Sequence, residues 1–241
     1  MHACLKMDAV PPVRASTRLS IAWGDRPPSE DTDTLVLTLD GIALDLRVFT
    51  CGPQAGEIEW ASVGVISHGE GHTEATPRLV WTHLLDSRRP PPTPASPGAF
   101  AVLNATDVRE TGRMYNPATE RHEAYAEIWR RFAASGPYAV LERVDGVYGS
   151  HESTADADAA GPRAFVAHFG RWALGVARDE DGAFAAYRDD NENGWVRKYE
   201  FGAAGAIPSI RALGGGLRVG ERVRLEVGEW EVRVAGIADR F

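Results

Sequence analysis

The chain contains little cysteine and no long apolar run. Only two cysteines, Cys4 and Cys51, occur in 241 residues, and such a pair does not make a disulfide framework, so we expect two free thiols. No run of about 18 apolar residues is present, which excludes a membrane-spanning helix. The opening residues also lack the apolar stretch of a signal peptide. We therefore expect a cytoplasmic protein that does not associate with membranes.

Basic clusters and nucleotide-binding motifs are missing as well. The 26 Lys and Arg residues are scattered among 34 acidic residues, and the formal net charge is -8, so nucleic acid is not expected as a partner. The chain has no P-loop, no G-x-S-x-G, no C-x-x-C pair and no dinucleotide fingerprint. The three glycines at 214–216 predict a turn, because no helix-forming sequence follows them. No cofactor is expected.

A succession of short β-rich segments makes up most of the chain. Thr34–Leu39 and Ile42–Phe49 carry apolar residues in a strand pattern, and Asp40-Gly41 between them supplies the positive φ angles of a tight hairpin. Further strands are predicted over Ile58–Ile66 and Arg78–Asp86. These segments predict an antiparallel meander.

One segment has the pattern of a helix. Asn116-Pro117 is typical of a helix start, and apolar residues follow at the i, i+3, i+4 and i+7 spacing of one helix face, namely Tyr125, Ile128, Trp129 and Phe132. We predict an amphipathic helix over 116–134. After it the β pattern resumes, with turn signals between six further segments.

These patterns predict two β domains and a flexible arm. Residues 1–18 are polar and show no periodicity, so we expect them to form a flexible arm. Residues 19–136 are predicted to form a first β-barrel domain that ends with the helix, and residues 137–241 a second β-barrel domain. The proline-rich run 89–98 is predicted to be an extended loop, open to a proline-recognising partner, and 150–162 a mobile loop.

Three segments resemble the fungal Hri-one family, which is named for interacting with a casein kinase. They are Ser20-Ile21-Ala22-Trp23-Gly24-Asp25 with Pro27-Pro28-Ser29-Glu30, then Trp81-Thr82-His83-Leu84-Leu85-Asp86-Ser87-Arg88, and Glu110-Thr111-Gly112-Arg113 leading to Asn116-Pro117-Ala118-Thr119. The resemblance runs from about residue 19 to the end and is strongest in the first half. It implies tandem antiparallel calycin-type (lipocalin-like) barrels, one per half. It carries over no catalytic motif, and fold does not fix function.

A glycine-rich segment between two predicted strands carries two histidines and a carboxylate. His68, Glu70 and His72 alternate with other residues, so on an extended strand they would project to one face, and His83 could add a fourth metal ligand. The same residues are ordinary in a solvated loop. We favour the loop and predict no metal site.

Polar residues that could carry chemistry gather around the strand at 78–86. Trp81 and His83 should share one face of this strand, with Asp86 on the other. Together with Glu110, Arg113 and Tyr115, they could orient a ligand or act as acid and base. Our catalytic candidates are His83, Asp86, Arg113 and Tyr115. The alternative, which we favour, is structural, with Asp86, Arg88 and Arg113 in ion pairs at a barrel rim and His83 in the core.

The second half offers aromatic residues near charged ones. Trp172, Tyr187 and Trp195 could grip an organic ligand, and with Trp81, His83 and Arg113 they complete our ligand-binding candidates. Aromatic residues are also common in ordinary strands.

Two functions remain open. The first, implied by the resemblance, is a non-enzymatic lipocalin-like protein that binds a small hydrophobic molecule or a protein partner. The second is a cofactor-free isomerase, lyase or pericyclase of fungal secondary metabolism that acts on a hydrophobic substrate in a barrel cavity. Unpaired sheet edges also give a route to a homodimer.

Overall fold

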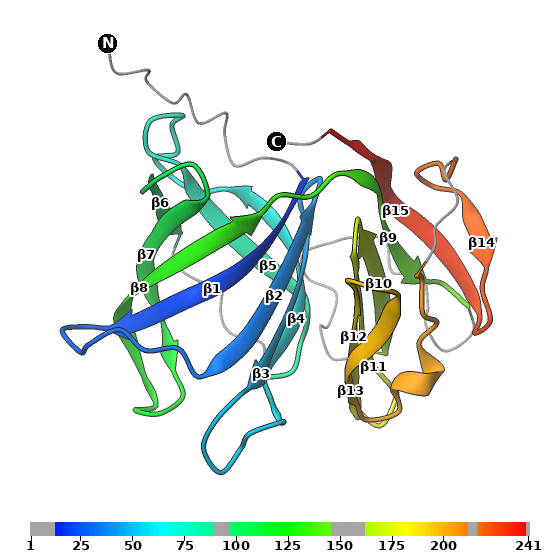
Figure 1. Ribbon diagram of the computed structural model, residues 1–241, viewed down its shortest axis with the longest axis horizontal. Coiled ribbons are helices and arrows are strands. Elements are labelled where there is room, and N and C mark those ends of the chain that lie inside the picture. The colour runs from blue at the N-terminus through cyan, green and yellow to red at the C-terminus, as the bar shows by residue number, and fades with distance from the viewer. Residues whose placement is uncertain (1–12, 89–96, 146–161, 212–215, 240–241) are drawn as a thin grey trace.

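The computed structural model describes residues 13–88, 97–145, 162–211 and 216–239, and its two sheets are both antiparallel (Figure 1). The first sheet closes into a barrel in which β1 pairs with β8. Its strands are β1 (Val13–Trp23), β2 (Thr32–Leu39), β3 (Ile42–Phe49), β4 (Ile58–His68), β5 (Arg78–Asp86), β6 (Gly98–Val102), β7 (Asp107–Asn116) and β8 (Arg121–Phe132). Register shifts in β1, β3 and β4–β5 supply the bends that closing a small barrel requires.

The second sheet has seven strands in the order β13-β12-β11-β10-β9-β15-β14. Its strands are β9 (Gly136–Arg143), β10 (Arg163–Phe169), β11 (Trp172–Arg178), β12 (Phe184–Asn191), β13 (Trp195–Phe201), β14 (Arg222–Arg224) and β15 (Glu229–Ala238). One turn of 3-10 helix, η1 (Ala204–Ala206), follows β13. None of the helices in the described ranges is long and apolar enough to cross a membrane.

The main core lies between the barrel and the second sheet. Leucines of β2 and β3 point out of the barrel wall and are fully buried against β10 and β11. Leu37 and Leu44, for example, share a cluster with Phe165, Phe169 and Leu174. Burial of this kind stabilises by roughly 25 cal/mol per Å² of apolar surface. The barrel therefore buries the outer face of β2 and β3, which leaves their inner face available for polar residues.

The tight hairpin predicted from Asp40-Gly41 is confirmed. Leu39 pairs with Ile42, and the two turn residues have φ angles of 45° and 87°, as a two-residue hairpin turn needs. The bounds predicted for Ile42–Phe49 and Arg78–Asp86 match β3 and β5.

The helix predicted over 116–134 is wrong, because this segment is the β7–β8 hairpin. Asn116 ends β7, and its side-chain oxygen accepts a hydrogen bond from the Ala118 N–H in the turn. In β8, apolar residues lie on both faces of the strand, with polar residues between them. Tyr125 and Trp129 face into the barrel, and Phe132 faces the main core. Apolar residues on both faces of a strand thus gave the spacing of a helix.

The expected arm is also too long, because β1 begins at Val13 and not at residue 19. Val13 and Ala15 are buried in the main core, whereas Arg14, Ser16 and Arg18 alternate with them. The sequence analysis did not predict this strand, because its buried inner residues are polar and the segment therefore resembles a solvated arm.

Among the described residues, only those of the first half form a closed barrel. In the described part of the second half, β13 and β14 are the two edges of an open sheet, which corrects the tandem-barrel expectation. One face of this sheet is covered by the barrel. On its other face a second cluster includes Tyr187, Ile207, Ile210 and Trp230. Both faces of the second sheet are therefore covered, although the sheet does not close into a barrel. The proline-rich run at 89–96 and the loop at 146–161 lie outside the described residues.

Candidate functional site

The inner face of the barrel carries buried charged and polar side chains. Strand alternation places Thr32 and Thr34 of β2 and Asp45 and Arg47 of β3 on this face, because the leucines between them face the main core. Burying charges is costly unless they are paired. The partners of these groups therefore define the site.

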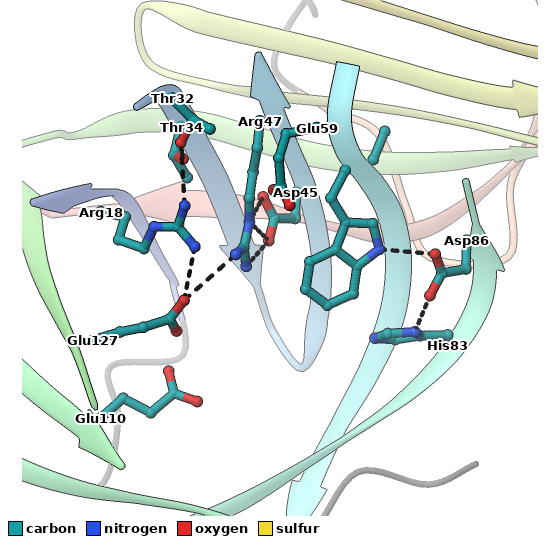
Figure 2. A network of polar contacts seen from close by, with 12 residues as sticks. Arg18, Thr32, Thr34, Asp45, Arg47, Glu59, His83, Asp86, Glu110 and Glu127 are labelled. Atoms are coloured by element: carbon teal, nitrogen blue, oxygen red, sulfur yellow. Dashed lines mark hydrogen bonds and ion pairs between the residues drawn. The ribbon is translucent and has the colours of Figure 1, made fainter. Parts of the chain in front are cut away.

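Two arginines are held by three carboxylates, of which Asp45 and Glu127 are shown in Figure 2. Arg18 donates from Nε to Glu30 Oε2 at 2.7 Å and from Nη1 to Glu127 Oε1 at 2.9 Å. Arg47 donates to Asp45 Oδ2 at 2.7 Å and lies 3.5 Å from the same Glu127 oxygen. Glu127 on β8 thus bridges β1 and β3 across the barrel.

A second buried carboxyl group lies beside Glu127. Glu110 of β7 is the direct cross-strand partner of Glu127, and its Oε1 accepts a hydrogen bond of 2.7 Å from the Tyr125 hydroxyl. Burial and the neighbouring Glu127 charge raise the pKa of Glu110 to about 8. The raised pKa favours the protonated form of Glu110, which can donate a hydrogen bond inside the barrel.

His83 and Asp86 form a hydrogen-bonded pair. His83 Nδ1 lies 2.6 Å from Asp86 Oδ2, and the other carboxylate oxygen accepts from Trp60 Nε1 at 2.8 Å. The expectation that Asp86 lies on the opposite face from His83 is wrong, because the register shift between Val63 and Gly64 adds a residue to β5. The pair has the orientation of a positioned base, with Nδ1 held by a carboxylate.

Replacing Asp86 by alanine should lower the free energy of unfolding by about 2–3 kcal/mol, because it leaves the buried donors of Trp60 and the Arg88 backbone without their acceptor. Urea unfolding measures the change. Asp25→Ala is the control, since Asp25 is exposed and should change stability by no more than about 0.5 kcal/mol. Equal stability of the two variants would contradict an anchoring role for Asp86.

The aromatic end of the interior, as we call it, contains a small cluster of its own. It consists of Val36, Ala43, Val108 and Trp129 with Ile66, Trp81 and Phe100 packed against them. The Trp81 and Phe100 rings lie 5.9 Å apart. The indole N–H of Trp129 is buried and reaches hydrogen-bond geometry with no described residue, although it lies near enough to Glu110 to lower that pKa. The Nε of Arg131 is also buried and reaches hydrogen-bond geometry with no described residue.

Two catalytic candidates do not join this site. Arg113 and Tyr115 lie on the opposite face of β7 from Glu110, since they are three and five positions further along the strand and side chains alternate between its faces. Arg113 donates to the carbonyl oxygen of His122, and the exposed Tyr115 packs on the His122 ring. The structure does not bring them to His83.

The aromatic candidates of the second half are separated from one another. Trp172 is buried in the main core, where its ring lies 5.1 Å from Phe132. Tyr187 and Trp195 belong to the cluster on the other face of the second sheet. The Tyr187 hydroxyl donates to the Pro208 carbonyl at 2.8 Å. All three pack in clusters outside the barrel interior.

The glycine-rich segment forms the β4–β5 turn. The rings of His68 and His72 stack with centroids 3.7 Å apart, and His72 Nδ1 lies 3.1 Å from the Arg78 amide nitrogen. Across the described ranges, no three His, Cys, Asp or Glu side chains are grouped as a metal site would need.

Sequence reasoning missed Arg18, Arg47, Glu127 and Arg131. The signal for one of them, Arg47, was present, because Asp45 and Arg47 alternate with leucines in a strand whose other face is fully apolar. A buried strand with one apolar face and one charged face predicts that the charged face lines a polar barrel interior.

Fold and site together define the class, a mainly β protein with a closed antiparallel barrel and a second sheet packed on it. The sequence matches the family model described as Protein HRI1 over residues 14–233. The chain therefore belongs to the HRI1 family, as its three resembling segments indicated.

One solved structure has the same fold. The crystal structure of the uncharacterized protein YLR301w from Saccharomyces cerevisiae aligns with a TM-score of 0.72 and 18% identity, over 93% of this chain and 99% of that one. Among curated protein sequences, none gives a significant match. The structural likeness concerns the fold alone.

Proposed function

We propose that the protein is a binding protein whose first barrel holds a small organic molecule with an apolar body. One observation carries the proposal: the barrel packs the apolar outer face of β2 and β3 on the second sheet and lines its inside with charged, hydrogen-bonding and aromatic side chains. Binding sites in small barrels combine an apolar wall with a few placed polar groups. Trp81 and Phe100 supply the wall, and Glu110 and Trp129 supply donors.

The enzyme alternative has less support. A cofactor-free isomerase or lyase needs a base and an acid that reach the same substrate. The His83–Asp86 pair and the protonated Glu110 could fill these roles, but Arg113 and Tyr115, expected to complete the group, lie on the outer face of β7. A protein partner is supported less again, because the exposed large apolar residues come from several separate segments. They are Val65, Val102, Leu103, Tyr115, Val196, Val219 and Ile237.

The test begins with native mass spectrometry of protein purified from its own organism, followed by denaturing extraction of any bound molecule. That molecule is then titrated into the protein by calorimetry. We expect Trp81→Ala to weaken its binding tenfold or more, about 1.4 kcal/mol, because an aromatic wall residue is lost.

Trp195→Ala is the matched control, since Trp195 lies in the cluster beyond the second sheet. Its binding should stay within twofold of the parent protein. Loss of binding in Trp195→Ala but not in Trp81→Ala would place the ligand outside the barrel. Protein that carries and binds no small molecule would contradict the proposal.

A further inference from the structure

We propose that the molecule held by the barrel is an organic carboxylate, bound by Arg131 and the indole N–H of Trp129 at the aromatic end of the interior. This inference rests on the proposed function and specifies the class of its ligand.

The two donors stand side by side on one strand. Trp129 and Arg131 are two residues apart in β8, and no register shift separates them in the pairing with β1, so both face the interior. The Trp129 residue is 8% exposed, and its Nε1 and the Nε of Arg131 are buried and reach hydrogen-bond geometry with no described residue, although the Glu110 carboxyl lies near enough to the indole N–H for its pKa to be lowered. Buried donors nearly always have partners, so an acceptor brought by a ligand is the simplest way to satisfy both.

The acceptor should carry a negative charge, because Arg131 has no described counter-ion. The other interior arginines differ in this respect: Arg18 and Arg47 are held by Glu30, Asp45 and Glu127. Burial lowers the pKa of Arg131, which shows that its charge is poorly compensated. Guanidinium groups pair well with carboxylates through charge-assisted hydrogen bonds.

The surroundings also favour an anion. Burial and the charge of Arg131 lower the pKa of Arg14, on the neighbouring strand β1, to about 9. The two guanidinium groups therefore lie close enough to repel each other. Glu110 opposes this shift of the Arg14 pKa only in its ionised form, and burial and the charge of Glu127 raise the pKa of Glu110 itself to about 8. An anion near Arg131 would relieve this repulsion.

The rest of the ligand should be apolar. Trp81, Phe100 and Val108 lie in one cluster with Trp129, and they would contact a planar or aliphatic body next to the carboxylate. The predicted class is thus a monocarboxylic acid with an apolar body.

The test uses acids paired with their neutral amides. 2-Naphthylacetate and octanoate are titrated at pH 7 against 2-naphthylacetamide and octanamide, and affinity is measured by calorimetry. We expect each acid to bind at least tenfold more tightly than its amide. In Arg131→Gln the preference for the acid over its amide should fall to threefold or less, while the affinity for the amide is retained. Trp129→Phe should lower the affinity for the acid, because phenylalanine keeps an aromatic ring but has no N–H donor.

Arg130→Gln is the matched control. Arg130 is the next residue in β8, faces outward and pairs with the Asp107 carboxylate, so the acid preference should persist. An amide that binds as tightly as its acid, or an unchanged preference in Arg131→Gln, would overturn the carboxylate assignment and leave the proposed function standing. If neither pair binds, the assignment also fails, and the co-purification experiment then decides the proposed function separately.

Discussion

Replacing Glu127 by alanine is expected to lower the free energy of unfolding by about 3–5 kcal/mol. Glu127 bridges Arg18 and Arg47 inside the barrel, and the exposed side-chain fractions of all three are 7% or less. Removing one partner of a buried ion pair leaves charge without compensation, which costs far more than the intact pair contributes. Two guanidinium groups would lose an acceptor at once.

Urea or thermal unfolding measures this loss. Arg121→Ala is the control on the same strand, because Arg121 is exposed and its replacement should change stability by no more than about 0.5 kcal/mol. Adding Arg47→Met to Glu127→Ala should recover part of the stability, since it removes one of the stranded charges. A Glu127→Ala variant as stable as Arg121→Ala would show that the network does not stabilise the fold.

The sequence predicted strands well where one face is apolar and a tight turn follows. The β2–β3 hairpin has both features, with Asp40 and Gly41 at its turn. It failed where a strand is apolar on both faces, as in β8, because the inner residues Tyr125 and Trp129 and the outer residue Phe132 together imitate a helix stripe. It also failed where the inner face is charged, as in β1.

The candidate site could be predicted only in part, for a physical reason. His83 and Asp86 are three residues apart, so their proximity is local, although their shared face depends on a register shift that spacing does not reveal. Arg18 and Glu127 are 109 residues apart in the chain. They meet because the last strand of the barrel pairs with the first, which is a property of the closed topology.

Replacing Glu110 by glutamine is expected to change how stability depends on pH. The pKa of Glu110 is raised from an ordinary 4.5 to about 8 by burial and by the charge of Glu127. The folded state therefore binds this proton more tightly than the unfolded chain does. Its contribution is fully present below pH 4.5 and is lost as the pH rises through 8.

The wild-type protein should lose stability over that range with a slope of up to about 1.4 kcal/mol per pH unit from this group. Glutamine keeps an acceptor for the Tyr125 hydroxyl and carries no charge, so Glu110→Gln should lack the slope. Relative to wild type, the variant should therefore gain stability as the pH rises from 5 to 9, by up to about 5 kcal/mol. Urea unfolding at pH 5, 7 and 9 measures it.

Glu30→Gln provides a control of opposite sign in the same network. The pKa of Glu30 is lowered: its burial opposes the shift, and its hydrogen bonds and ion pair with Arg18 outweigh that burial. The stability that Glu30 contributes is thus present above its unfolded pKa and lost in acid. Glu30→Gln should be destabilising at pH 7 and lose this effect toward pH 3, whereas Glu110→Gln should differ most from wild type at pH 9. Parallel pH profiles for Glu110→Gln and wild type would mean that Glu110 is ionised in the folded protein, and the barrel would then hold an additional negative charge at neutral pH.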